Sequence, residues 1–136
     1  MIQRLKNIVC FCLLACLVAV SLTGCSASTG TIEGTVTVDG KPVKGVEVIF
    51  RHKELPAEGS GVSDDSGAYR VFYGRAKRDL PVGDYNLSLG VMLPEESEES
   101  SSKLRRQVKQ FNDSPRTETI ESGTNVITIE VADSAK

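Results

Sequence analysis

The chain has 136 residues, a hydrophobic content of 40% and a formal net charge of −2, which suits one domain and not two. The 16 basic residues include Arg4 and Lys6, so 14 basic residues face 18 acidic ones after residue 24. This acidic balance argues against a nucleic-acid partner, because such binding depends on a basic surface that displaces phosphate counterions.

The first segment has the layout of an export signal. Arg4 and Lys6 precede an apolar run, Ile8 to Leu22, in which Ser21 is the only polar residue. The run has 15 residues, fewer than the roughly 20 that a helix needs to cross hydrocarbon, and no basic cluster follows it. We therefore interpret residues 1–24 as a helical signal peptide that is removed.

The stretch Leu22-Thr23-Gly24-Cys25 closes this segment. It resembles the lipobox of bacterial lipoproteins, in which the cysteine thiol receives a diacylglyceryl group and becomes the new N-terminus. The other three cysteines lie upstream, so Cys25 keeps no disulfide partner after processing. Two or three acyl chains hold a protein on its membrane, since each buried methylene contributes roughly 0.8 kcal/mol. The alternative is an ordinary signal peptide cleaved near Ala27.

Residues 25–30 are expected to be the lipidated cysteine and a short tether. Ser26 to Gly30 is small and polar and spans at most about 17 Å at roughly 3.4 Å per residue. The domain that follows, residues 31–131, is therefore expected to work close to the membrane. The residue after Cys25 is Ser26 and not Asp, which by resemblance to the sorting rule of Gram-negative envelopes implies the outer membrane.

Alternating apolar residues predict a series of half-buried strands from Thr31 to Val91. Turns are predicted at Asp39–Pro42 and Asp64–Gly67, a loop at residues 52–60 and a short strand at Gly61–Ser63. The inward positions of the longer strands are Ile32, Gly34, Val36, Val38, Val46, Val48, Phe50, Tyr69, Val71, Tyr73, Tyr85, Leu87, Leu89 and Val91.

The last third of the chain shows weaker patterns. Met92–Ser102 contains the acidic run Glu95 to Glu99 and four serines, so we expect a solvated loop. The basic run Lys103 to Lys109 suits one or two helical turns or an extended edge. A weak strand at Thr117–Glu121, a turn at residues 122–125, a buried face with Ile127, Ile129 and Val131, and a tail at residues 132–136 complete the chain.

Strands with turn signals about ten residues apart predict an all-β sandwich or barrel. The succession Gly34–Val43, Val46–Phe50, Asp65–Tyr69 and Leu80–Tyr85 resembles carboxypeptidase regulatory-like domains, which belong to the transthyretin-like (prealbumin-like) group. The resemblance covers residues 31–131 and implies a seven-stranded Greek-key β-sandwich. It says almost nothing about function, because one fold hosts many tasks.

The residues of the chain do not favour an enzyme. His52 is the only histidine, so a zinc site would need carboxylates around one imidazole, and no Gly-x-Ser-x-Gly elbow occurs. The hydroxyisourate hydrolases that look like transthyretin, and intradiol dioxygenases on a similar sandwich, both need more than one histidine. We predict no catalytic residue, no metal and no cofactor, with His52 exposed.

Three further groups of residues allow two interpretations each. Asp64-Asp65-Ser66-Gly67 is predicted to be a turn held by aspartate side chains, with a calcium site as the alternative. The acidic run Glu95 to Glu99 and the basic run Lys103 to Lys109 are expected to pair or to be solvated, with contact to anionic headgroups as the alternative. Alternation points Tyr69, Tyr73 and Tyr85 inward, which leaves Phe72 as the only outward aromatic for stacking on a sugar.

These inferences predict a non-catalytic lipoprotein of the bacterial cell envelope. It would be anchored through acyl chains on Cys25, and its single sandwich would serve as an interaction or structural module for an envelope protein or glycan. A carbohydrate-binding module is the alternative function.

Overall fold

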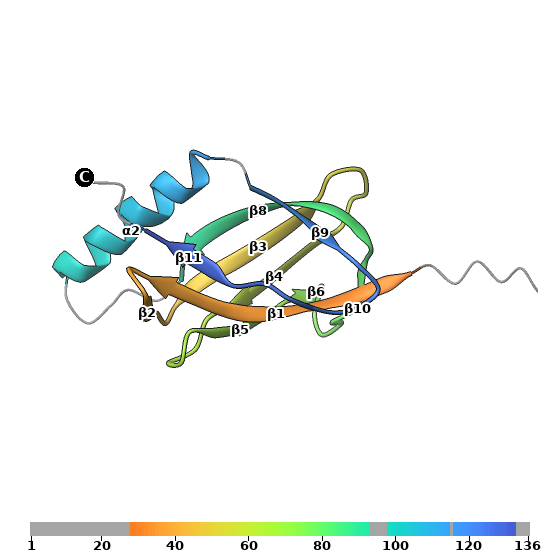
Figure 1. The fold of residues 1–136 in the computed structure, drawn as a ribbon, viewed down its shortest axis with the longest axis horizontal. Coiled ribbons are helices and arrows are strands. Elements are labelled where there is room, and N and C mark those ends of the chain that lie inside the picture. The colour runs from red at the N-terminus through yellow and green to blue at the C-terminus, as the bar shows by residue number, and fades with distance from the viewer. Residues whose placement is uncertain (1–27, 93–97, 115, 133–136) are drawn as a thin grey trace, which may run out of the picture.

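Two β-sheets packed face to face form the body of the protein, with one helix against one end of them (Figure 1). This computed structural model describes residues 28–92, 98–114 and 116–132. The predicted all-β sandwich is confirmed. The predicted helical signal peptide, residues 1–24, lies outside the described residues.

The first sheet is organised around β1 (Thr29–Val38). Along one edge β1 pairs antiparallel with β2 (Lys41–Pro42), β5 (Ala68–Arg70) and β7 (Leu80–Pro81). Along the other edge it pairs parallel with β10 (Gly123–Val126) and β11 (Ile129–Val131). β1 therefore pairs with strands from the early, middle and late parts of the described chain.

The second sheet is antiparallel throughout. Its order is β6 (Phe72–Tyr73), β4 (Glu58–Val62), β3 (Val46–His52), β8 (Gly83–Val91) and β9 (Arg116–Ile120). The β3–β8 ladder runs without a break from Val46 opposite Val91 to His52 opposite Tyr85. Short interruptions separate β5 from β6 and β10 from β11, and β2, β6 and β7 have two residues each.

The core lies between the sheets and follows the predicted alternation. Phe50 and Tyr85 meet edge to face with ring centroids 6.3 Å apart, a favoured geometry for aromatic pairs. The side chains that are fully buried in this layer include Ile32, Val36, Val46, Val48, Phe50, Val71, Leu80, Tyr85, Ile120, Ile129 and Val131.

Two local predictions in the sheets are wrong. β4 begins at Glu58, inside the predicted loop 52–60, because its backbone pairs with β3 from Arg51 opposite Glu58 onward. The turn predicted at residues 122–125 largely falls within β10 (Gly123–Val126), which pairs with Gly30 to Glu33 of β1. The partner lies more than 90 residues away in the sequence, so no local pattern indicates it.

The predicted solvated loop at Met92–Ser102 is also wrong in part. Residues 93–97 lie outside the described residues, but α2 (Glu98–Asn112) begins at Glu98 and is longer than the one or two turns considered. Leu104 and Val108 are buried and Phe111 is partly buried, the i, i+4, i+7 spacing of one helix face. Glu98 and Glu99 lie in the first turn and Lys109 in the last, an order that the helix dipole favours.

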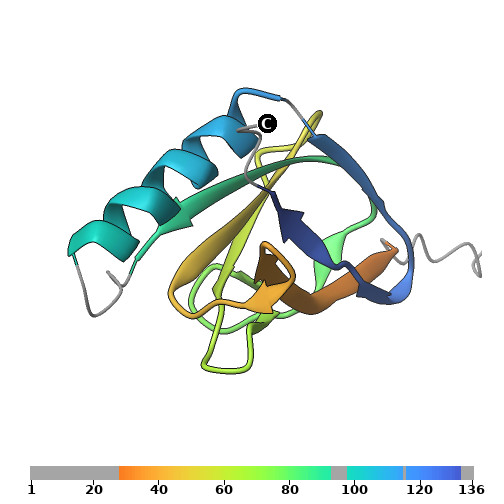
Figure 2. The ribbon, with the colours of Figure 1, turned by 60° about the vertical axis from the view of Figure 1, so that its left-hand side comes forward.

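The helix covers the edge of β8 beyond the point where its pairing with β9 ends. Figures 1 and 2 show α2 beside the ends of β8 and β11. The side-chain amide of Asn112 accepts a hydrogen bond from the Leu89 N–H at 2.9 Å and donates one to the Leu89 carbonyl at 2.8 Å. Asn112 thereby takes the place of a neighbouring strand beyond the end of the β8–β9 ladder.

Tyr69 of β5 links β1 to the segment between β10 and β11 from inside the core. It lies opposite Gly34 in the β1–β5 ladder, and its hydroxyl donates a 2.7 Å hydrogen bond to the Ile127 carbonyl on the far side of β1. A β-carbon on Gly34 would overlap that same carbonyl oxygen. Because Gly34 has no side chain, the Tyr69 side chain can pass over β1 at this position.

We expect Gly34→Ala to lower the free energy of unfolding by roughly 1–3 kcal/mol, the usual cost of forcing an extra group into a packed core. Urea denaturation measures this. Gly90→Ala is the matched control, since a β-carbon there meets only the Glu47 side chain at 3.3 and 3.6 Å, and it should change stability by less than about 0.5 kcal/mol. Equal losses in both variants would contradict this role for Gly34.

The buried tyrosines should make the fold sensitive to alkali. Burial, with a smaller contribution from the nearby Tyr73, raises the pKa of Tyr85 to about 12 from the ordinary 10.0. Burial likewise raises the pKa of Tyr69. A neutral tyrosine in the folded state stabilises the fold below the ordinary pKa, and this contribution is lost as the pH rises through the raised pKa. The window therefore runs from about pH 10 to about pH 12.

Tyr85→Phe tests this sensitivity. The variant loses the 2.7 Å hydrogen bond from the Tyr85 hydroxyl to the Pro81 carbonyl, so at pH 7 it should be less stable by roughly 0.5–1.5 kcal/mol. Between about pH 10 and 12 its stability should fall less steeply than that of the wild type, as urea titrations at several pH values would show. Parallel curves for the two proteins would contradict the assignment.

Candidate functional site

Exposed apolar side chains gather at one hollow on the surface. Five large apolar side chains of the described residues are exposed, and three of them, Val62, Phe72 and Val126, line the same hollow, which has a volume of about 570 Å³. We call it the Phe72 groove; its other lining residues are Glu33, Gly34, Thr35, Gly61, Asp64, Ala68, Tyr69 and Arg70. Gathered apolar surface of this kind is typical of an interaction site.

The groove lies where the chain passes from one sheet to the other. Ala68 to Arg70 pair with β1 in the first sheet, and Phe72 and Tyr73 pair with β4 in the second. Buried Val71 sits at the crossing. Gly61 of β4 makes the crossing possible, because a β-carbon there would overlap the Arg70 carbonyl oxygen. Side chains from both sheets thus face one hollow.

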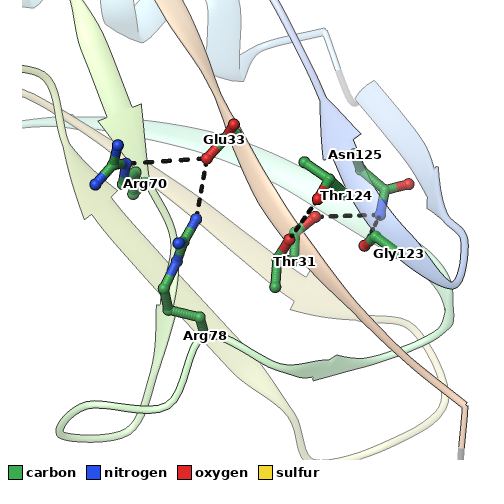
Figure 3. A network of polar contacts seen from close by, with 7 residues as sticks. All are labelled: Thr31, Glu33, Arg70, Arg78, Gly123, Thr124 and Asn125. Atoms are coloured by element: carbon green, nitrogen blue, oxygen red, sulfur yellow. Dashed lines mark hydrogen bonds and ion pairs between the residues drawn. The ribbon is translucent and has the colours of Figure 1, made fainter.

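Glu33 and Arg70 line the groove with the apolar residues, and Figure 3 shows them with Arg78 in one charged cluster. One carboxylate oxygen of Glu33 is 3.0 Å from Arg78 Nη2 and 3.9 Å from Arg70 Nε. Arg78 Nε is buried, and it is the one buried side-chain nitrogen or oxygen within residues 28–92, 98–114 and 116–132 that lacks a hydrogen-bond partner. Both guanidinium groups are therefore ion-paired with the same Glu33 oxygen, and of the two only Arg78 lies within hydrogen-bond distance of it.

Arg70 is the more available of the two arginines. Its side chain is 68% exposed. Within the part of the chain that the structure describes, its guanidinium forms no hydrogen bond, and its separation from Glu33 exceeds hydrogen-bond distance. A planar group with five N–H donors is therefore open to a ligand.

Polar contacts between β1 and β10 position Val126 at the groove. Figure 3 shows Asn125, whose amide nitrogen donates to the Thr31 carbonyl at 3.2 Å, and Thr124, whose hydroxyl lies 3.4 Å from that of Thr31. Asn125 also holds the preceding turn through bonds to both backbone groups of Glu121. The next residue, Val126, pairs with Glu33 and is 71% exposed.

Asp64 forms the turn that the sequence predicts. One carboxylate oxygen accepts hydrogen bonds from the Ser66 hydroxyl and the backbone N–H groups of Ser66 and Ala68, at 2.6 to 3.1 Å. These bonds, that of the hydroxyl first, lower the pKa of the Asp64 carboxyl. Asp65 pairs instead with Lys44 at 2.7 Å. Among the described residues no group of three or more His, Cys, Asp and Glu side chains is arranged to hold a metal ion.

His52 is half-buried rather than exposed. Its Nδ1 accepts hydrogen bonds from the backbone N–H groups of Glu54 and Leu55, and its Nε2 lies 3.3 Å from the Val82 carbonyl. The ring packs edge to face on Tyr85, with centroids 4.8 Å apart. Both ring nitrogens therefore contact backbone groups, and His52 lies outside the Phe72 groove.

The aromatic side chains divide as the alternation predicts. Tyr69 and Tyr85 are buried and Tyr73 is half-buried, whereas Phe72 is 42% exposed. Three candidates considered from the sequence, Asp64, Tyr69 and Phe72, line the groove. Sequence reasoning missed Val62, Val126 and Arg70, although the period of two places each of them on an outward face of its strand.

The basic run lies on α2. Lys103 reaches Asp39 at 3.4 Å, whereas Arg105, Arg106 and Lys109 are exposed. Glu95 and Glu96 of the acidic run lie outside the described residues. α2 lies at the end of the sandwich opposite the start of β1 (Figure 1).

The predicted lipidation site, Cys25, lies outside the described residues, as do the signal peptide and residues 26–27 of the tether. Thr29 and Gly30, predicted to belong to the tether, are the first residues of β1. Within the described residues, none of the helical structure is long and apolar enough to cross a membrane.

Comparisons with known proteins identify no family. The chain matches no protein-family model and no curated protein sequence. The solved structures that are similar to it include two Bacillus proteins. The TIE protein of Bacillus anthracis is 13% identical over 78% of this chain and 17% of its own, with a TM-score of 0.48. BcpA, the major pilin subunit of Bacillus cereus, is 20% identical over 79% of this chain and 31% of its own, with a TM-score of 0.48. This chain thus spans less than a third of either protein, and likenesses this distant say nothing about its function.

Proposed function

We propose that this protein is a non-catalytic lipoprotein of the bacterial cell envelope whose sandwich is an interaction module. The Phe72 groove is its recognition surface. The observation that carries the proposal is the gathering of Val62, Phe72 and Val126 from three strands at one hollow beside exposed Arg70. Aromatic residues and arginine are enriched at the centres of protein interfaces.

The lipid anchor is the second part of the proposal. It rests on the basic N-terminal region, the apolar run and Leu22-Thr23-Gly24-Cys25. Ser28 accepts a 3.1 Å hydrogen bond from the Val82 N–H, and Cys25 precedes Ser28 by three residues, or about 10 Å of extended chain. The end of the sandwich where β1 begins would then lie near the membrane. By the sorting resemblance of Ser26, that membrane is the outer one.

The residue chemistry supports a non-catalytic role. The ring nitrogens of His52 are engaged with backbone groups, and Asp64 is engaged in its own turn. We retain the resemblance to carboxypeptidase regulatory-like domains as part of the proposal, on the turn motifs that carry it.

A carbohydrate-binding module is the second candidate function. It is favoured by one observation, the exposed ring of Phe72 beside polar Thr35, Glu33 and Arg70 in the same groove. Aromatic faces with neighbouring polar side chains suit sugar rings, although only one aromatic ring lies on the surface of the groove.

Cys25→Ala should leave the chain uncleaved or release it from the membrane, because no thiol remains to accept the diacylglyceryl group. Intact-mass measurement of protein purified from envelopes checks this. The wild type should begin at Cys25 and carry acyl mass. A wild-type protein that begins upstream of Cys25, or radioactive fatty acid on the variant, would contradict the anchor.

Phe72→Ser should abolish capture of the native partner by cross-linking in intact envelopes, because it removes the central apolar contact of the groove. Leu55→Ser is the matched control: Leu55 is 48% exposed but lies outside the groove, and its loss should leave capture unchanged. Identical capture profiles for the two variants would contradict the proposal. Retention of the wild type on a glycan array, lost in Phe72→Ser, would favour the carbohydrate-binding function.

A further inference from the structure

We propose that the Phe72 groove recognises a protein segment that presents a carboxylate beside an apolar side chain, and that Arg70 receives this carboxylate. The inference rests on the proposed function, in which the groove is the recognition surface. It adds the chemistry of the partner and the residue that selects it.

The first step is the state of Arg70. Its guanidinium has five N–H donors in a planar fork, and no hydrogen bond reaches them from any other described residue. The nearest carboxylate oxygen, on Glu33, is 3.9 Å from Arg70 Nε and already accepts a 3.0 Å hydrogen bond from Arg78. The fork is therefore free to bind a carboxylate through two parallel hydrogen bonds.

The second step is the balance of donors and acceptors around it. Glu33 and Asp64 both line the groove with Arg70, and Arg78 adds a second cation, so the cluster is close to neutral. One oxygen of Asp64 is occupied by the turn, and the Glu33 oxygen nearest to Arg70 accepts its hydrogen bond from Arg78. Among the described residues, the Arg70 donors therefore have no acceptor within hydrogen-bond distance, and a hydrogen-bonded carboxylate supplies one.

The third step is the apolar surroundings. Val62, Phe72 and Val126 share the groove with Arg70 and are 41%, 42% and 71% exposed. A ligand that covers them removes water from the guanidinium, which strengthens an ionic hydrogen bond. Two valines and one phenylalanine offer an apolar side chain more contact than they offer a sugar, whose edges carry hydroxyl groups. The surface therefore favours a protein segment over a glycan.

A small-molecule titration tests this chemistry without knowledge of the partner. The probe is 3-phenylpropionate, added to the isotope-labelled full chain in detergent micelles and followed by NMR. We expect saturable shifts of the Val62 and Val126 methyl groups, with a dissociation constant near the millimolar range that suits so small a ligand. The neutral amide, 3-phenylpropionamide, should bind about tenfold more weakly, because it lacks the charge-assisted bonds.

Variants assign the effect to Arg70. Arg70→Gln should weaken 3-phenylpropionate about tenfold and leave the amide unchanged, and Arg70→Lys should recover part of the loss because it keeps the charge but not the fork. Arg105→Gln, on the exposed face of α2, is the matched control and should bind as the wild type does. Unchanged amide binding shows that a variant is folded.

Several results would overturn the inference. They are equal binding of the acid and the amide, full binding by Arg70→Gln, shifts outside the groove, or binding of glucuronate as strong as that of 3-phenylpropionate, which would point to an acidic sugar. If any of these occurs while Phe72→Ser still abolishes capture in envelopes, the proposed function stands and only the chemistry assigned to the partner falls. If capture also survives in Phe72→Ser, both fall.

Discussion

The hydrogen bond from Tyr69 to the Ile127 carbonyl is the contact on which the arrangement of the first sheet depends. It joins β5 to the segment between β10 and β11 across the centre of β1. The contact is possible because Gly34 has no side chain at the point of crossing. A buried hydroxyl without a partner is costly, so the bond favours one position of β10 and β11 along β1 over the alternatives. The parallel pairs on either side, Glu33 with Val126 and Val36 with Ile129, take their register from the same place.

The groove is a consequence of this frame. Because β10 is held beside β1, Val126 emerges next to Glu33, and because Gly61 lets β4 approach the Arg70 carbonyl, Val62 and Phe72 emerge close by. The exposure of any one of these apolar side chains is ordinary by itself, since single exposed apolar side chains are common on protein surfaces. Their convergence, together with a guanidinium that has no hydrogen bond from the rest of the described chain, distinguishes this part of the surface. In the same fold, the side chains of His52 and Asp64 accept hydrogen bonds from nearby backbone N–H groups.

The errors in the sequence-based prediction share one cause. The strands with strong alternation, such as Val46 to Phe50 and Tyr85 to Leu89, were predicted correctly because one face of each is buried in the core between the two sheets. β10 has no buried alternation of its own, and it exists because β1 offers it backbone partners. α2 begins in a polar, serine-rich stretch and is held by Leu104, Val108 and the two bonds from Asn112 to Leu89. In both elements the stabilising partner is distant in the sequence.

The sequence by itself determined the all-β class, most of the core and the inward or outward direction of the aromatic residues in the strands, because the period of two acts between near neighbours. It also supplied the whole case for a lipid anchor at Cys25. Only the tertiary structure decided that Val62, Phe72, Val126 and Arg70 share one hollow, and that Arg78 takes the Glu33 oxygen nearest to Arg70. The groove joins residues up to 93 positions apart, Glu33 and Val126, and its geometry depends on strand register and on two glycines. The alternation of polar and apolar residues along the sequence carries no information about strand register or about the close contacts at these glycines.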